Sequence, residues 1–254
     1  MTDRKDEIAG NLAKVERRIA EACAAAGRAR DEVTLIVVTK TYPASDVRIL
    51  AELGVRHVAE NRDQDAAPKA AQCADLPLVW HFVGQLQTNK VRSVVGYADL
   101  VQSVDRARLV TALSREAVRA GREIGCLVQV ALDAEESAPA PGVGGGSREG
   151  RVSTGGRGGV APAEIGELAD LIARSPGLRP AGLMTVAPLA GAYAGRPRAA
   201  FDRLMDLSTD LRRAHPAATM VSAGMSADLE DAVAAGATHV RVGTAVLGVR
   251  AGLG

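Results

Sequence analysis

The sequence repeats one unit, a short apolar run followed by a stretch with helical periodicity, and this repeat strongly constrains the fold. We predict eight strands, at residues 35–39, 57–60, 78–83, 100–103, 127–132, 182–186, 220–222 and 239–242. Several of the intervening helices end at a glycine, as at Gly54, Gly121 and Gly236. Eight strand–helix units predict an α/β protein with a (β/α)8 TIM barrel, and a doubly wound sheet is the alternative.

A further helix precedes the first unit. Ile8, Leu12, Val15, Ile19 and Cys23 recur at three- and four-residue spacing. The chain has 254 residues, of which 47% are hydrophobic, so it can bury a core of single-domain size. We therefore expect one barrel domain over residues 1–254 with an extra N-terminal helix.

Charge and cysteine content narrow the class of function. The net charge is +1 with 24% charged residues, and no basic stretch alternates with aromatic residues. This balance argues against a nucleic-acid partner and against an anionic membrane surface. Three separated cysteines, no C-x-x-C pair and no long apolar segment predict a soluble cytoplasmic protein without a disulfide framework or a metal site.

Lys40 closes the first apolar run, just before a Thr-Tyr-Pro segment that cannot continue a strand. Alternation along the strand puts Ile36, Val38 and Lys40 on one face. If that face is the barrel interior, desolvation favours the neutral, nucleophilic form of the amine, which can condense with an aldehyde. The structural alternative is a lysine that extends into solvent.

Polar residues also accompany other predicted strands. Asn61 follows the second strand, His81 lies between Trp80 and Phe82 in the third, and Ser226 follows the seventh. Function in a barrel gathers at the carboxyl ends of the strands, so each is a candidate site residue. Each also has a structural explanation, because Asn61 and Ser226 can cap the following helices and His81 can be a hydrogen-bonded core histidine.

The segments after the last two strands, S-A-G-M-S and G-T, supply hydroxyl groups and unobstructed backbone N–H groups near helix N-termini. Such groups suit a dianionic phosphate, and barrels frequently bind phosphate at this pair of loops. Arg241 lies between valines in the last strand, so it needs an anion or an acceptor atom to face.

Four sequence blocks carry a resemblance to a known family. They are T-K-T-Y-P at 39–43, A-E-N-R at 59–62, W-H-F-V-G-Q-L-Q-T-N-K at 80–90 and S-A-G-M-S-A-D-L-E-D-A-V-A-A-G-A-T-H-V-R-V-G-T-A-V-L-G at 222–248. Together they resemble the pyridoxal phosphate homeostasis proteins over nearly the whole chain. The resemblance implies a barrel similar to the N-terminal domain of alanine racemase, which is fold type III of the pyridoxal phosphate proteins.

The resemblance also implies a cofactor site and no catalytic residue. The implied cofactor-binding residues are Lys40, Asn61, His81, Ser222, Met225, Arg241, Gly243 and Thr244. Lys40 would hold pyridoxal 5′-phosphate covalently as a Schiff base, and Arg241 would face the pyridine nitrogen. Ser222, Gly243 and Thr244 would cradle the phosphate. A guanidinium leaves no proton on the ring nitrogen, so the ring would be a weak electron sink.

The function that the resemblance implies is binding and delivery of the cofactor in intracellular homeostasis, without robust turnover. Apo forms of pyridoxal phosphate enzymes are the implied recipients, and the chain would be a monomer or a weak homodimer. Two alternatives stay open. A racemase-like enzyme needs a second acid–base group, for which Tyr193 is a candidate, whereas a phosphosugar or other phosphate-binding barrel enzyme would leave Lys40 without a role.

Residues 134–159 depart from the resembling family, which crosses here with a short loop. The segment holds nine glycines together with proline, serine and arginine. This composition predicts a disordered insertion, because it supplies too little apolar surface to pack. The alternative is a glycine-rich lid over the mouth of the barrel.

Overall fold

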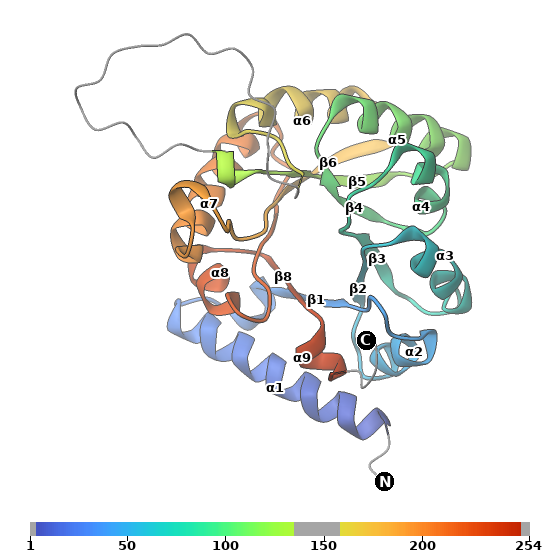
Figure 1. The fold of residues 1–254 in the computed structure, drawn as a ribbon, viewed down its shortest axis with the longest axis vertical. Helices are drawn as coiled ribbons and strands as arrows, with labels where there is room; N and C mark the ends of the chain where they lie inside the picture. The colour runs from blue at the N-terminus through green and yellow to red at the C-terminus, as the bar shows by residue number, and fades with distance from the viewer. Residues whose placement is uncertain (1–3, 135–157, 250–254) are drawn as a thin grey trace, which may run out of the picture.

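The computed structural model describes residues 4–134 and 158–249, and its strands form a closed parallel barrel in chain order (Figure 1). The strands are β1 Thr34–Val38, β2 His57–Glu60, β3 Val79–Phe82, β4 Leu100–Val104, β5 Ile124–Gln129, β6 Leu178–Met184, β7 Met220–Ser222 and β8 His239–Val242. Because β1 pairs in parallel with both β2 and β8, the sheet is closed. The TIM barrel is confirmed, and the doubly wound alternative is excluded.

Helices surround the ring of strands (Figure 1). They are α1 Arg4–Ala25, α2 Ala44–Glu52, α3 Asp63–Gln72, α4 Val91–Tyr97, α5 Ala107–Ala120, α6 Ile165–Arg174, α7 Pro197–Ala214, α8 Leu229–Ala235 and α9 Thr244–Leu247. Short 3-10 helices are η1 Arg30–Glu32, η2 Thr88–Lys90, η3 Leu132–Ala134, η4 Pro162–Glu164 and η5 Gly191–Tyr193. The predicted ends at Gly54, Gly121 and Gly236 are confirmed, since all three have positive φ.

Apolar residues fill the layer between the strands and the helices. In α5, for example, Leu109, Leu113 and Ala117 recur every four residues and are fully buried. The inside of the barrel differs, because buried polar side chains from several strands project there; His81, Gln102 and Arg241 are examples. Buried polar groups require partners, so this interior needs a hydrogen-bond network.

The helix α1 covers the seam where the first and last strands meet, and it contacts α2, α8 and α9. Arg4 donates to the Asp46 carboxylate of α2 at 2.6 Å and to the Leu247 carbonyl of α9 at 2.8 Å. At the other end of α1, Arg18 pairs with Glu230 of α8 at 2.8 Å. The predicted N-terminal helix therefore exists and joins elements from both ends of the chain.

The predicted bounds of two strands are wrong by more than one residue. The strand β5 spans Ile124–Gln129 rather than 127–132, and β6 spans Leu178–Met184 rather than 182–186. Pro180 interrupts the pattern of β6, yet it sits opposite Cys126, next to a shift in register between the two strands. A proline is tolerated at such an irregularity because the ladder is already interrupted there.

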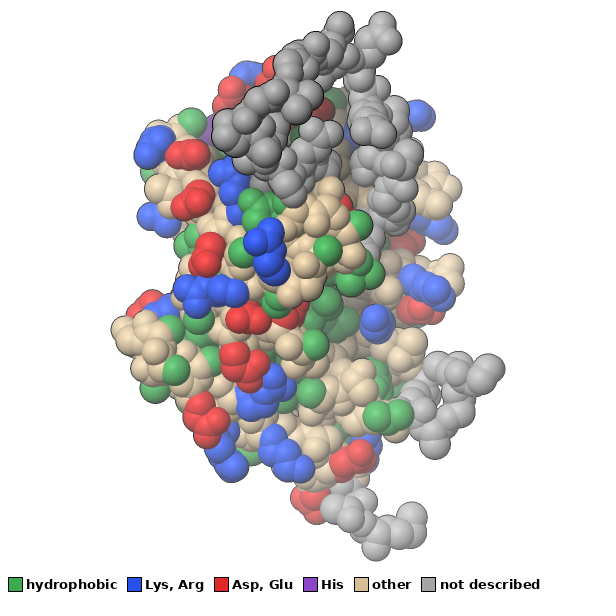
Figure 2. Space-filling view, turned by 60° about the vertical axis from the view of Figure 1, so that its left-hand side comes forward, with side chains coloured by type: hydrophobic (Ala, Val, Ile, Leu, Met, Phe, Trp, Pro, Cys, Tyr) green, Lys and Arg blue, Asp and Glu red, His purple; other side chains and the backbone are tan. Residues whose placement is uncertain are grey.

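The surface carries both signs of charge. Figure 2 shows basic and acidic side chains interspersed over the visible face, with hydrophobic side chains among them. None of the described helices has the length and apolarity to cross a membrane. Of the insertion predicted at 134–159, residues 135–157 lie outside the described ranges. Just after it, Val160 forms a parallel bridge with Val130 at the end of β5.

Candidate functional site

Lys40 lies in the turn between β1 and α2 and its side chain is exposed. The expectation of a desolvated amine inside the barrel is wrong. The strand ends at Val38, and the chain then turns through Thr41, whose φ is +70°. Alternation therefore stops before Lys40, and its amine lies at the open, carboxyl-terminal end of the barrel instead of in the core.

The end of β8 lies directly beside the end of β1. Ile36 pairs with Arg241, and Val37 pairs with Val242. A Cβ atom added at Gly243 would lie 3.1 Å from the Val38 carbonyl oxygen, so the two chains approach closely where both strands stop. Lys40 and Gly243 thus leave the barrel at neighbouring positions, as the predicted site requires.

A buried lysine that the sequence analysis missed supports the turn that carries Lys40. The Nζ atom of Lys69, in α3, donates to the Thr39 backbone carbonyl at 2.7 Å and to the Glu60 carboxylate. The Thr39 hydroxyl donates to the same Glu60 oxygen at 2.6 Å. Glu60 and Lys69 are both buried. The signal was Glu60 itself, because a carboxylate at the end of a buried strand needs a buried cation.

Arg241 is buried inside the barrel, and its side chain makes two hydrogen bonds there. Its Nη1 donates to the Ser222 hydroxyl at 2.7 Å and its Nη2 donates to the Thr185 carbonyl at 2.8 Å. The Ser222 hydroxyl donates in turn to the side-chain amide oxygen of Gln102, Oε1, at 2.7 Å. Burial lowers the pKa of Arg241 to about 10, while the charge of Asp228 acts in the opposite direction. The guanidinium therefore stays protonated at neutral pH.

The structure separates the residues predicted to cradle a phosphate. Ser222 is fully buried and its hydroxyl is engaged with Gln102 and Arg241, whereas Thr244 is exposed at the start of α9. Met225 and Ser226 are exposed in the loop after β7. The structure thus brings Ser222 to Arg241 and leaves Gly243, Thr244 and the loop after β7 at the open end.

Asn61 and Ser226 are not helix caps. The cap positions of α3 and α8 are Arg62 and Asp228, and the Asp228 carboxylate accepts the Met225 N–H at 2.6 Å. Asn61 is half-buried directly after β2. A Cβ atom added at Gly84 would lie 2.0 Å from the Asn61 carbonyl oxygen, so a glycine after β3 is needed to fit this backbone.

His81 is fully buried inside the barrel. Its Nδ1 lies 2.8 Å from Gln102 Nε2, and its Nε2 lies 3.0 Å from His57 Nδ1. Burial holds the pKa of His81 well below its usual range, and the charges of His57, His239 and Arg241 act in the same direction. The structure therefore makes His81 a neutral, hydrogen-bonded core histidine, which was the structural alternative.

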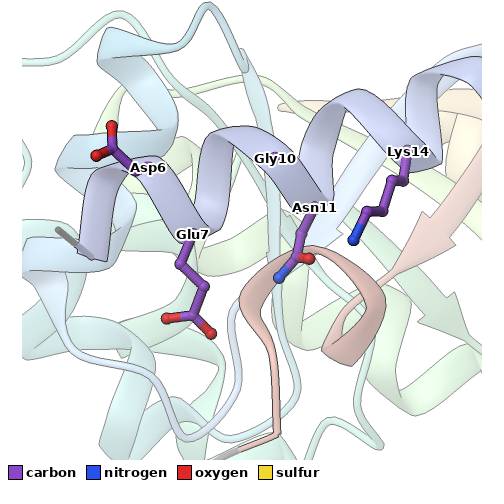
Figure 3. Close-up of a pocket in the computed structure, with 5 residues that line it drawn as sticks. All are labelled: Asp6, Glu7, Gly10, Asn11 and Lys14. Atoms are coloured by element: carbon purple, nitrogen blue, oxygen red, sulfur yellow. The ribbon is translucent and has the colours of Figure 1, made fainter. Parts of the chain in front are cut away.

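A surface recess of about 480 Å³ lies along α1 and is distinct from these residues. Figure 3 shows its lining side chains projecting from one helix; they are Asp6, Glu7, Asn11 and Lys14, with Gly10 between them. None of the eight candidate residues lines it. Within residues 4–134 and 158–249, no cluster of three or more histidine, cysteine or carboxylate side chains could hold a metal ion.

The buried pair generates a stability prediction. Replacing Lys69 with Met should lower the free energy of unfolding by about 3–5 kcal/mol, because it leaves the Glu60 carboxylate buried and unpaired. Urea denaturation measures this change. Lys90→Met, at an exposed lysine in η2, is the matched control and should change stability by less than about 0.5 kcal/mol. Equal effects of the two substitutions would contradict the buried ion pair.

Comparison with known proteins agrees with the barrel fold. Residues 151–251 match the alanine racemase N-terminal domain family. A pyridoxal phosphate homeostasis protein of Mycobacterium bovis is 40% identical and covers 98% of this chain and 95% of its own. One from Pseudomonas aeruginosa is 39% identical, with 96% of each chain covered.

A solved structure of a similar protein supports the same fold. PipY of Synechococcus elongatus, with PLP bound, is 33% identical, has a TM-score of 0.74, and covers 95% of this chain and all of its own. The two curated relatives match this chain over nearly the full length of both chains. This chain belongs to the pyridoxal phosphate homeostasis protein family.

Proposed function

We propose that this protein binds pyridoxal 5′-phosphate at the open end of the barrel and acts in its homeostasis, as a carrier and buffer of the cofactor. The observation that carries the proposal is Arg241, a buried and protonated guanidinium held in place inside the barrel on β8, opposite Ile36 of β1. Its relative PipY, 33% identical, has been solved with PLP bound. Apo forms of pyridoxal phosphate enzymes are the proposed recipients.

Residues at the mouth and just inside the barrel fit the three recognition features of the cofactor. The exposed amine of Lys40 suits covalent capture of the aldehyde. Gly243 and Thr244 lead into α9, and the first N–H groups of a helix lack partners within the helix, which suits the phosphate. Arg241 can donate to the ring nitrogen. When bound, the cofactor supplies an electrophilic aldehyde and an electron-accepting ring.

The remaining residues of the implied cofactor site differ in their exposure. Asn61 and Met225 flank the mouth on the loops after β2 and β7. Ser222 and His81 are enclosed, so we assign them indirect roles behind Arg241 rather than direct contact with the cofactor. The exposed hydroxyl of Ser226 replaces that of Ser222 in our proposed phosphate contact.

Arg241 also favours retention of the cofactor over turnover. A guanidinium only donates hydrogen bonds, and at a pKa of about 10 it keeps its protons at neutral pH. A pyridine nitrogen held against Arg241 would stay unprotonated, and the ring would then withdraw electrons weakly. Tyr42, the tyrosine nearest Lys40 in the sequence, is buried and donates its hydroxyl to the Gly248 carbonyl. Tyr42 is therefore not available as a second acid–base group, and Tyr193 stays the candidate of the racemase-like alternative.

The attachment residue is tested by hydride reduction of the protein incubated with pyridoxal 5′-phosphate, followed by mass spectrometry of its peptides. The pyridoxyl group should map to Lys40 and should be absent from Lys40→Ala, because that variant has lost the amine. Lys90→Ala, which removes an exposed lysine elsewhere, should keep the adduct. An adduct that persists in Lys40→Ala would refute the assignment.

The phosphate contact is tested by comparing two ligands. Thr244→Asp should lower the affinity for pyridoxal 5′-phosphate by about tenfold or more, because a carboxylate beside the dianion adds repulsion. The affinity for pyridoxal should fall by less than about twofold, because pyridoxal has no phosphate for the carboxylate to repel. Titration followed by absorbance gives both affinities, and Thr244→Asn is the uncharged control. Equal losses for the two ligands would show that the phosphate lies elsewhere.

The carrier role is tested by exchange of the Cα proton of alanine and serine in heavy water, with analysis of product chirality. We expect no exchange above that of Lys40→Ala, because racemisation requires acid and base groups on opposite faces of the carbon. Robust exchange that disappears in Tyr193→Phe would instead establish a racemase-like enzyme.

A further inference from the structure

A row of hydrogen-bonded side chains crosses the inside of the barrel behind Arg241. In order they are Arg241, Ser222, Gln102, His81 and His57, from β8, β7, β4, β3 and β2. The successive distances are 2.7, 2.7, 2.8 and 3.0 Å. The first four side chains are buried, and His57, the first residue of β2, is half-buried. The row therefore connects the guanidinium to the amino-terminal end of a strand.

Every hydrogen bond in the row points the same way. A guanidinium can only donate, so the Ser222 oxygen accepts from Arg241 and its own proton goes to the Gln102 carbonyl. This orientation turns the Gln102 amide N–H toward His81 Nδ1. A neutral His81 with Nδ1 as acceptor carries its proton on Nε2, which then donates to His57 Nδ1.

Burial keeps the histidines of the row neutral. It lowers the pKa of His81, and His57, His239 and Arg241 around it act in the same direction. Burial lowers the pKa of His239 to about 4, and its ring centroid lies 6.3 Å from that of His57. Burial also lowers the pKa of His57, while the charge of Asp99 raises it. With neutral rings, each histidine provides one donor and one acceptor, as the row requires.

We propose that Gln102 is a positioning residue for Arg241. Its carbonyl takes the Ser222 proton, which leaves the Ser222 oxygen as a pure acceptor for the guanidinium, and its amide ties that arrangement to His81. The inference rests on the proposed function in one respect, namely that Arg241 faces the ring nitrogen of the cofactor. The row itself involves only side chains of this chain.

Gln102→Met is the decisive variant, because Met fills a similar volume without an amide. In this variant the Ser222 hydroxyl loses its acceptor and can rotate toward other groups, so Arg241 keeps only the Thr185 carbonyl as a fixed partner. Ser103→Ala is the matched control, since Ser103 lies next along β4 and its buried hydroxyl has no hydrogen-bond partner. If Gln102→Met does not fold, Gln102→Leu serves with the same readouts.

The first readout needs no cofactor. The chain has four histidines, so ¹⁵N-histidine NMR with single His→Gln assignments resolves each ring. In the parent protein, His81 should be protonated at Nε2 and not at Nδ1. In Gln102→Met, the Nδ1 signal should move to the position of a nitrogen without a hydrogen bond, and the Arg241 guanidinium protons should exchange faster with water. A proton on Nδ1 in the parent, or signals unmoved in the variant, would overturn the proposal.

The second readout is a double-mutant cycle on pyridoxal 5′-phosphate affinity. Gln102→Met should weaken binding about tenfold in the parent and less than about twofold in a Ser222→Ala background, because Gln102 acts through Ser222. Equal losses in both backgrounds, or no loss in the parent, would overturn the positioning role. A parent protein that binds no pyridoxal phosphate would refute the proposed function, while the NMR result would still decide the row.

Discussion

The charge of Arg241 inside a closed barrel is the constraint on which much of the structure depends. A buried guanidinium destabilises the fold unless acceptor atoms surround it. Thr185 and Ser222 supply these acceptors from the ends of β6 and β7. Ser222 then needs an acceptor of its own, which Gln102 supplies from β4. One charge on the last strand thereby determines polar residues on several others.

A buried ion pair organises the neighbouring part of the mouth, at the ends of β1 and β2. Glu60 and Lys69 neutralise each other and hold the Thr39 carbonyl, one residue before Lys40. The Glu60–Lys69 pair holds the backbone at Thr39 in place, whereas the row behind Arg241 holds the Arg241 side chain in place. The two arrangements leave Lys40 itself exposed on a well-anchored turn, where it can react with a ligand that arrives from solvent.

The barrel could be predicted from the sequence because the spacing of apolar residues in the repeated unit depends directly on which residues are buried. Strand and helix periodicities differ, and the glycines at helix ends are local signals. The start of β6 was missed because Pro180 is tolerated by a register shift that involves β5, a neighbour in space. Lys40 was placed inside the barrel because alternation was extended past Val38, where the strand ends.

Polar contacts were harder to predict than elements. Ser222 and Thr244 both read as phosphate ligands, yet one hydroxyl is enclosed and the other is exposed. The difference arises from the direction of each side chain relative to Arg241 and Gln102, which lie far away in the sequence. Lys69 was missed for a different reason, because the need of Glu60 for a cation becomes evident only when Glu60 is known to be buried.

The seam between β1 and β8 has a consequence for synthesis of the protein. Its two strands are separated by almost the whole chain, and the contacts of α1 with α8 and α9 span a similar separation. Domains emerge from the ribosome N-terminal end first, and contacts of large sequence separation form slowly. Lys40 is made early, but Arg241 and Thr244 reach it only when the last strand has emerged. A nascent chain therefore exposes Lys40 before the other residues of the proposed site are in place, and that site is assembled only when the barrel closes.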